Sequence, residues 1–339
     1  ESGKLELVGM CSPSAPASIQ VPRIYHTSTL VETSGHSKVV VVGGKGNFGV
    51  VGTVEIYHPE YGKWTYGAKM PSATYSHSAN LIFEGGILLS GGVGDSGTSN
   101  SAHIYHPEKD SWSVTGPLVD PRDGHGSAVL SDGRVLVTGG QFGGSPMTST
   151  EIYNPNGGSW SKVSDLSTPR WGHTTTLLTN GLVLVTGGRL FGEPLHTAEI
   201  FDPVLGVWKL VASMATPRWG HTATQLLDGR VLVTGGADGT LSAEIYDSKI
   251  DTWNSAGEMF AERKGHTSSL MPDGRVMIVG GRTFVPVSYT EIFDPSVAAD
   301  HSWVKTDNLS GPRDLPDRTI PVHRMRRTLR HLPVRGGMP

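Results

Sequence analysis

The stretch Thr216–Trp253, TPRWGHTATQLLDGRVLVTGGADGTLSAEIYDSKIDTW, decides the fold. It holds four short segments suited to β-strands, and the sharpest break between them is Asp228-Gly229. An Asp-Gly pair between two apolar runs is typical of a β-hairpin with a type I′ turn, in which both central residues have positive φ. The stretch therefore predicts a sheet of four antiparallel strands, and the same turn is expected at Asp132-Gly133, Asn180-Gly181 and Asp273-Gly274.

The double glycine of this stretch recurs along the chain at nearly constant spacing. The first five copies are 48 residues apart and the sixth follows after 45, at Gly43-Gly44, Gly91-Gly92, Gly139-Gly140, Gly187-Gly188, Gly235-Gly236 and Gly280-Gly281. A period of this length indicates an array of similar structural units. The segment before each pair is apolar at almost every position, as in VLVTGG, so both faces of its sheet are buried. Four-stranded blades that cover one another around a channel form a β-propeller.

Aromatic residues follow each double glycine in a fixed order. After Glu-Ile in most copies comes a Tyr or Phe, and then a Trp: Tyr57, Tyr105, Tyr153, Phe201, Tyr246 and Phe293, with Trp64, Trp112, Trp160, Trp208, Trp253 and Trp303. This order resembles the kelch repeat and covers residues 21 to about 305. The resemblance implies an all-β, kelch-type β-propeller with six complete four-stranded blades. It leaves function open, because kelch propellers include both interaction modules and enzymes.

The two ends of the chain bear on how the propeller closes. Leu5–Met10, LELVGM, resembles the end of a fourth strand, LVASM at Leu210–Met214, and Gly311-Pro312-Arg313 restarts the repeat. We expect an N-terminal arm over 1–22, six repeats over 23–310, and over 311–339 either a basic tail or part of a seventh blade split between the termini. The tail carries seven Arg and two Asp, and no strand corresponding to the third of a blade follows Gly337.

Composition excludes several classes of protein. No apolar run reaches the roughly 18 residues of a membrane-spanning helix, so membrane insertion is not expected. The one cysteine, Cys11, excludes an internal disulfide framework and a cysteine metal site. No phosphate-binding or nucleic-acid motif occurs, so nucleic acid is not an expected partner. The chain begins at Glu1 without a Met or a signal-type apolar stretch, and the single sequon at Asn308 slightly favours an extracellular location.

Three polar columns recur with the repeat. One histidine occurs in each copy, at His26, His77, His125, His173, His221 and His266. A metal ring is one interpretation, but we expect buried structural imidazoles that bond a backbone group of the next blade. Arginines three residues before the histidine, and glutamates at the start of the third strand, both disappear in the second copy, which has Thr74 and His103. The coincidence predicts an Arg–Glu pair within each blade, such as Arg170–Glu199 and Arg218–Glu244, rather than a basic ring for anions.

The loops after the double glycines differ in every copy, although the framework around them is nearly uniform. They should share one face of the disc with the connections between blades, and variable loops on a rigid frame are where recognition usually occurs. Aromatic residues beside cations could stack on sugars or anchor a peptide. We therefore expect ligand binding at Phe142, Trp171, Arg189, Phe191, Trp219 and Arg282. In the alternative interpretation, Trp171 and Trp219 fill the seam between two blades.

The sequence favours a binding or scaffold module for a protein or glycan partner, with no cofactor and no metal. The rival class is a carbohydrate-active enzyme on a kelch propeller, of the sugar epimerase or lyase type. Tyr25-His26 also resembles the Tyr-His copper-ligand pair of galactose-oxidase-like copper radical oxidases. Those enzymes additionally need a Cys cross-linked to a second Tyr, and Cys11 lies outside the repeats. No Ser-His-Asp or paired-carboxylate spacing identifies a catalytic group, and the sequence does not fix the oligomeric state.

Overall fold

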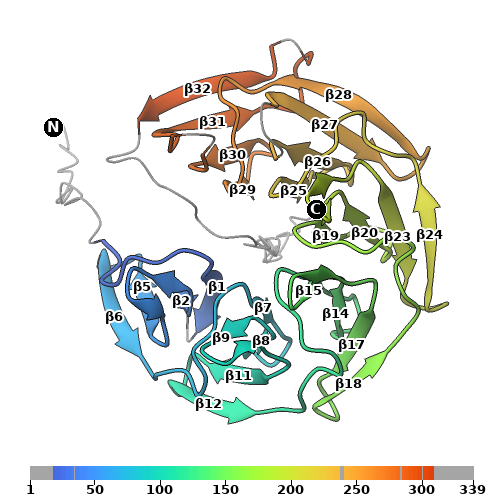
Figure 1. The fold of residues 1–339 in the computed structure, drawn as a ribbon. Coiled ribbons are helices and arrows are strands. Elements are labelled where there is room, and N and C mark those ends of the chain that lie inside the picture. The colour runs from blue at the N-terminus through green and yellow to red at the C-terminus, as the bar shows by residue number, and fades with distance from the viewer. Residues whose placement is uncertain (1–17, 34, 237–239, 283–284, 300, 309–339) are drawn as a thin grey trace, which may run out of the picture.

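The computed structural model describes residues 18–33, 35–236, 240–282, 285–299 and 301–308. All secondary structure in this part of the chain is β-strand, in six antiparallel four-stranded sheets and four two-stranded hairpins. The six sheets stand around a central axis as the blades of a β-propeller, which confirms the predicted fold (Figure 1). No helix of the described residues is long and apolar enough to cross a membrane.

Each blade uses its strands in chain order from the axis outward. Blade 1 consists of β1 (Thr27–Thr33), β2 (His36–Val42), β5 (Val54–His58) and β6 (Lys63–Gly67). Blade 2 consists of β7 (Ser78–Leu81), β8 (Ile87–Ser90), β11 (Ala102–His106) and β12 (Ser111–Val114). Blade 3 consists of β13 (Gly126–Val129), β14 (Val135–Thr138), β17 (Thr150–Asn154) and β18 (Ser159–Lys162).

The second half of the ring repeats this plan. Blade 4 consists of β19 (Thr174–Leu177), β20 (Val183–Thr186), β23 (Ala198–Asp202) and β24 (Val207–Val211). Blade 5 consists of β25 (Thr222–Gln225), β26 (Val231–Thr234), β27 (Ser242–Asp247) and β28 (Thr252–Glu258). Blade 6 consists of β29 (Thr267–Leu270), β30 (Val276–Val279), β31 (Tyr289–Phe293) and β32 (Trp303–Asn308). The first strands pack on one another around the axis, and the fourth strands form the outer edge of the disc (Figure 1).

Short hairpins follow four of the double glycines, on one face of the disc. They are β3 (Lys45–Gly46) with β4 (Gly49–Val50), β9 (Val93–Gly94) with β10 (Gly97–Thr98), β15 (Gln141–Phe142) with β16 (Ser145–Pro146), and β21 (Arg189–Leu190) with β22 (Glu193–Pro194). The predicted position of each double glycine, at the end of the second strand of its blade, is confirmed.

The turns between the first and second strands differ from the expected type I′ turn. In this turn of blade 3, Gly133 has positive φ, at 88°, and Asp132 does not. The amide of Gly133 donates to the carbonyl of Leu130, and the amide of Leu130 donates to that of Arg134. This pattern matches a type I turn followed by a left-handed glycine. The carboxylate of Asp132 instead accepts the amide N–H of Arg134 at 3.1 Å, so Asp caps the turn.

The double glycine clamps each blade to the next. The amide of Gly140 donates to the carbonyl of Arg170 in the following blade at 2.9 Å. Gly139 has φ 53°, and a Cβ there would lie 2.5 Å from the same carbonyl oxygen. Only glycine therefore permits this approach of two backbones. Equivalent hydrogen bonds from the second glycine join blades 1 to 2, 2 to 3, 4 to 5 and 5 to 6.

A second set of backbone hydrogen bonds runs around the axis. The residue before each column histidine has a φ between 53° and 68°, and in blades 2 to 6 its amide donates to the corresponding carbonyl of the preceding blade. This belt joins Tyr25, Ser76, Gly124, Gly172, Gly220 and Gly265 in turn. Glycine takes this left-handed conformation freely, whereas other residues do so at a cost. Tyr25 and Ser76 are therefore the strained members of the belt.

The predicted Arg–Glu pairs exist in five blades, and blade 2 lacks one. Distances between Arg Nη2 and Glu Oε1 are 2.6 Å for Arg122–Glu151, 2.8 Å for Arg170–Glu199 and 2.9 Å for Arg218–Glu244. Arg23–Glu55 and Arg263–Glu291 are also paired. The five guanidinium groups are fully buried, and burial lowers the pKa of Arg23, Arg122, Arg170 and Arg218.

The histidine column is structural, but its hydrogen bonds differ from the prediction. Nε2 of His77 lies 2.9 Å from Oγ1 of Thr27, and Nε2 of His125 lies 2.9 Å from Oγ of Ser78. The partner is thus a hydroxyl of the preceding blade, not a backbone group of the next one. The cause is that the first strands face each other across the seam, which brings a Thr or Ser side chain within reach. Burial lowers the pKa of His77 to about 4 and that of His266 to about 3, so both are neutral at pH 7.

Candidate binding face

Two positions in each blade build the rim around the axis on the face that carries the hairpins. One is the residue two before the column histidine, and the other is the residue after the double glycine. Isolated β-bridges join them as Ile24–Lys45, Tyr75–Val93, Asp123–Gln141, Trp171–Arg189 and Lys264–Arg282. In blade 5 the first position is Trp219, and its partner position falls outside the described residues. The backbone of these pairs is uniform, so the side chains alone distinguish one blade from another.

Blades 4 and 5 bring three of the predicted ligand residues together, and blade 6 adds a lysine to them. The guanidinium carbon of Arg189 lies 4.5 Å from the ring centroid of Trp219 and 5.9 Å from that of Trp171. The two indoles lie 6.1 Å apart and are tilted by 50°. Lys264 comes from blade 6, and its Nζ lies 4.8 Å from the ring centroid of Trp219. We call Trp171, Arg189, Trp219 and Lys264 the tryptophan–cation cluster.

The cluster combines rigidity with accessible polar groups. All four side chains are half-buried, so the indoles meet across the boundary of blades 4 and 5 without being fully covered. Nε of Arg189 donates to the carbonyl of Gly192 at 2.7 Å, which holds the guanidinium against the hairpin β21–β22. Cation–π contacts of this kind stabilise a cation by roughly 0.5–2 kcal/mol, depending on how far it is desolvated. The cluster is therefore an ordered, cationic and aromatic surface.

The remaining predicted residues lie around this cluster. Phe142 is on β15 of blade 3 and is 53% exposed. Phe191 lies at the tip of hairpin β21–β22, is 80% exposed and has φ 44°. Arg282 is joined to Lys264 through two backbone hydrogen bonds. All three follow a double glycine, so they lie on the hairpin-bearing face that also carries the cluster.

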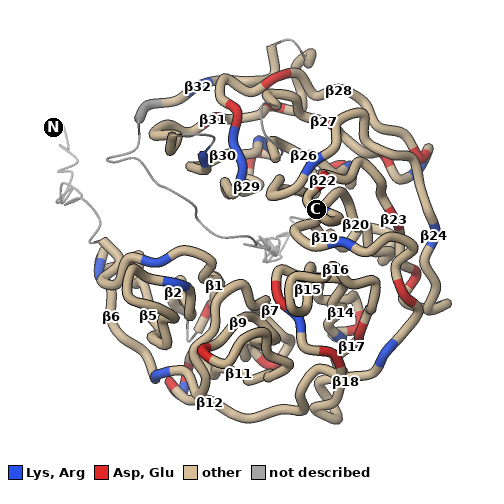
Figure 2. The backbone as a smooth tube through the Cα atoms, viewed as in Figure 1, with Lys and Arg blue, Asp and Glu red and all other residues tan. Residues whose placement is uncertain are grey.

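Lys264 was missed by the sequence analysis, although a signal for it exists. It occupies the position two residues before His266, as Trp171 and Trp219 do before their histidines. Blades 1 and 2 hold a comparable contact. There Nζ of Lys45 lies 5.3 Å from the ring centroid of Tyr75, and the ring centroids of Tyr25 and Tyr75 are 6.2 Å apart. Figure 2 shows positive residues beside β19 and β29, on the inner side of the ring. Among the charged rim residues, Lys45, Arg189, Lys264 and Arg282 are cations and Asp123 is the carboxylate.

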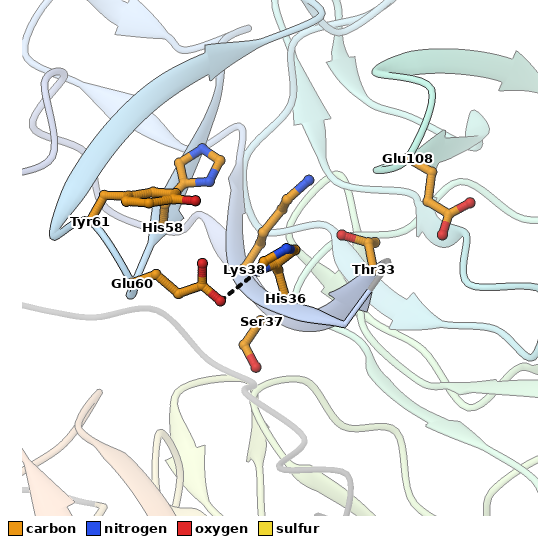
Figure 3. A pocket seen from close by; sticks show the side chains of 8 residues that line it. All are labelled: Thr33, His36, Ser37, Lys38, His58, Glu60, Tyr61 and Glu108. Atoms are coloured by element: carbon orange, nitrogen blue, oxygen red, sulfur yellow. Dashed lines mark hydrogen bonds and ion pairs between the residues drawn. The ribbon is translucent and has the colours of Figure 1, made fainter.

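On the face opposite the hairpins, the turns between the first and second strands are not all alike. Blade 1 has seven-residue strands β1 and β2 in place of the four-residue strands of blade 2. This longer hairpin, together with turns of blades 1 and 2, borders a hollow of about 220 Å³ (Figure 3). Its lining includes Lys38, His58, Tyr61 and Glu108, and Nδ1 of His36 lies 2.5 Å from Oε1 of Glu60.

The copper-ligand likeness at Tyr25-His26 does not extend to a donor set. Within the residues described, no group of three His, Cys, Asp or Glu side chains is arranged to hold a metal ion. Burial lowers the pKa of His26 to about 4, and the backbone carbonyl of Tyr25 accepts the amide of Ser76 in the belt. Cys11, the one thiol, lies outside the described residues. The described residues around Tyr25-His26 therefore do not form the ligand set of a copper radical centre.

Comparisons with known proteins agree with this architecture. The model of the KLHDC2/KLHL20/DRC7 Kelch-repeats domain matches residues 9–188, and that of the Kelch motif matches residues 170–215. Among solved structures, a fungal alcohol oxidase of the AA5 family, determined in complex with copper, is 19% identical with a TM-score of 0.69. The match covers 87% of this chain and 67% of that one, and at this identity it shows the fold alone. Because a family model matches more than half of the chain, the protein belongs to the kelch-repeat β-propeller family.

Proposed function

We propose that this kelch propeller is a binding module whose hairpin-bearing face receives a protein partner. The observation that carries the proposal is the tryptophan–cation cluster, in which Arg189 is held against two half-exposed indoles. Tryptophan and arginine are enriched among residues that dominate binding energies at protein interfaces. Phe142 and Phe191 flank the cluster as exposed apolar side chains at 53% and 80% exposure. Large apolar side chains cost solubility when they stay in water, so their placement beside an ordered cationic centre favours a docking surface.

The chemistry of the rim selects an acidic partner segment with an apolar or aromatic side chain. Four cations and one carboxylate occupy the charged rim positions, and the carboxylate of Asp123 already accepts hydrogen bonds from Gln141 and Thr98. Among the described residues, the side chain of Arg189 donates one hydrogen bond, from Nε to the carbonyl of Gly192. Its two terminal nitrogens are therefore able to pair with a carboxylate. An arginine presents such donors in a planar fork that matches a carboxylate. The tryptophans and the flanking phenylalanines supply the apolar contact area.

A peptide array and a glycan array, probed with the purified full chain, test this proposal. We expect acidic peptides that contain an aromatic residue to bind. Arg189→Ala and Lys264→Ala should each weaken binding about tenfold, which corresponds to about 1.4 kcal/mol. Arg230→Ala is the matched control, because Arg230 pairs with Asp228 in a turn on the opposite face. Binding that is insensitive to Arg189 and Lys264 but lost in the control would disprove the assignment of the face.

A glycan partner and a carbohydrate-active enzyme remain the competing hypotheses. The hollow bordered by His36, Lys38, His58 and Glu60 gives the enzyme hypothesis a defined place to test, on the opposite face. Glycan binding that depends on Trp219 would replace the protein partner by a sugar. Turnover of a sugar substrate that is lost in His58→Ala, with Arg189→Ala unaffected, would move the function to that hollow.

A further inference from the structure

The ring has one seam that lacks the contacts found at the other five. Between successive blades from 1 to 6, the second glycine of the pair donates to the next blade, the belt continues, and the first strands pack together. In the described part of the chain, none of these three links joins blade 6 to blade 1. The belt thus ends at Gly265 on one side and at Tyr25 on the other, and β1 and β29 lie apart in Figure 1.

The face of blade 1 at this seam is less covered than the same face of every other blade. The position of Val39 is occupied elsewhere by Ile87, Val135, Val183, Val231 and Val276, and these five residues are 0% exposed. Val39 itself is half-buried. Tyr57 is likewise half-buried, although its five counterparts are at most 2% exposed. Nε2 of His26 also has no bond to a hydroxyl of another blade among the described residues, unlike its five counterparts.

The face of blade 6 at the seam shows the same departure. Met277 is half-buried, whereas its counterparts Val40, Leu88, Leu136, Leu184 and Leu232 are at most 1% exposed. Met271 and Val279 are half-buried too, and their counterparts in blade 5, Leu226 and Thr234, are 2% and 0% exposed. Both seam faces therefore carry apolar side chains of the kind that a neighbouring blade covers elsewhere. Leaving them in water would forgo roughly 25 cal/mol per Å² of apolar area.

The described chain enters and leaves the ring at this seam. At the other boundaries the chain passes from a fourth strand directly to the first strand of the next blade, and β32 of blade 6 ends at Asn308 beside the seam. The carboxylate of Glu55 accepts the amides of Gln20 and Val21 just as Glu151 accepts those of Val119 and Asp120. The chain therefore enters blade 1 as it enters blade 3, which it reaches from the fourth strand of blade 2.

We propose that residues 1–17 and 309–339 together cover the seam as a reduced seventh blade. The two segments are together as long as one 48-residue repeat. Leu5–Met10 has the sequence of a fourth strand, and Gly311-Pro312-Arg313 and Gly336-Gly337 have those of the start and end of a first hairpin. Leu5–Met10 then supplies the outer strand of this blade. The occupant of the seam is thus the chain itself.

Thermal unfolding of seam variants tests the proposal. Met277→Ala is compared with Leu232→Ala, its counterpart in a covered seam. With the seam covered, both substitutions remove buried apolar volume and each should lower Tm by at least about 4 °C. Deleting 309–339 should lower Tm and reduce the effect of Met277→Ala to less than about half, with the effect of Leu232→Ala unchanged. A Met277→Ala variant with unaltered Tm in the full chain overturns the proposal.

Hydrogen exchange of the full chain gives a second measurement that does not depend on a truncated variant folding. The amides of Leu5–Met10 should exchange at least about tenfold more slowly than in a free peptide of the same sequence. Unprotected exchange there shows that the N-terminal segment is not part of a blade. A dimer whose Tm rises with protein concentration, with Leu5–Met10 unprotected, assigns the seam to a second copy instead.

Discussion

Blade 5 and blade 2 have the same fold, but blade 5 buries an Arg–Glu ion pair at two positions where blade 2 has no charge. In blade 5, Arg218 donates to the carbonyls of Gly235 and Ser242 and to the carboxylate of Glu244, all within 2.9 Å. That carboxylate in turn accepts the amides of Ala215 and Thr216. In blade 2, Thr74 and His103 stand at these two positions and no charge is buried there. The ion pair is therefore one solution to a problem that the fold can also solve without charge.

The two blades also differ in the backbone amides that need a carboxylate as hydrogen-bond acceptor. The residue three before Arg218 is Ala215, whose amide needs an acceptor, and the corresponding residue in blade 2 is Pro71. Proline has no amide N–H, so the loss of the carboxylate leaves one donor fewer to satisfy. A hollow of about 10 Å³ lies at this place, lined in part by Thr74, Ser101 and His103. Blade 2 thus avoids the desolvation of two ions and accepts looser packing.

The largest effect is expected from breaking the pair in blade 5. Glu244→Leu leaves the Arg218 guanidinium buried without its counter-ion and removes the acceptor for two amides. We expect the free energy of unfolding to fall by about 3–5 kcal/mol. Chemical denaturation at pH 7 measures the change. His103→Leu, at the same position of blade 2, is the matched control and should change stability by less than about 1 kcal/mol.

A double variant sharpens this first result. Arg218→Met combined with Glu244→Leu removes both charges, and buried ion pairs replaced by apolar residues are often close to neutral. The double variant should therefore lose less stability than Glu244→Leu alone. A loss equal to the sum of the two single changes would show that the hydrogen bonds to Gly235 and Ser242, rather than the charge balance, carry the stabilisation.

Acid is expected to have a smaller effect on stability, through two histidines of blade 2. The pKa of His77 is lowered from 6.5 to about 4, chiefly by burial, and that of His103 is also lowered by burial. The folded protein therefore binds fewer protons than the unfolded chain between pH 6.5 and 4, and stability is lost as pH falls through this window. One such histidine contributes a slope of about 1.4 kcal/mol per pH unit.

Variants assign this slope to individual residues. His77→Gln should flatten the pH dependence of stability between pH 6.5 and 4 by about one proton, whereas His103→Gln, at a half-buried position, should flatten it less. Denaturation midpoints at pH 7, 6 and 5 give the slopes. Equal flattening by both variants would contradict the order of burial.

Regular spacing explains how much of this molecule could be predicted. The double glycines, the Asp-Gly turns and the aromatic order are properties of neighbouring residues, so they predicted six blades of four strands each. The pair Arg218–Glu244 was predicted from two columns that fail together in the second copy. A repeated sequence provides its own internal comparison, and the structure confirmed what that comparison indicated.

Contacts between blades were harder to predict, because they depend on side-chain direction rather than spacing. The hydroxyl partners of the histidines and the capping role of Asp132 were not foreseen. The site was predicted in part: Trp171, Arg189 and Trp219 meet, but Lys264 was overlooked because an isolated lysine carries little information in sequence. The half-buried faces at the seam appear only when the same position is compared across all blades in space.

The smallest effect in this comparison concerns the belt residue before the histidine. Ser76 of blade 2 has φ 53°, and Gly220 of blade 5 has φ 64°. A left-handed conformation costs a residue with a Cβ about 1 kcal/mol or more, partly offset by the greater freedom of glycine in the unfolded chain. Ser76→Gly should therefore stabilise the protein by about 0.5 kcal/mol. Gly220→Ser should destabilise it by a similar amount, because its Cβ would meet Cβ of Lys264 at an ordinary 3.6 Å and add no clash. Denaturant midpoints of the two variants against the parent chain measure both changes. If Gly220→Ser costs several kcal/mol while Ser76→Gly is neutral, the belt in blade 5 is constrained by packing on blade 6 rather than by backbone conformation.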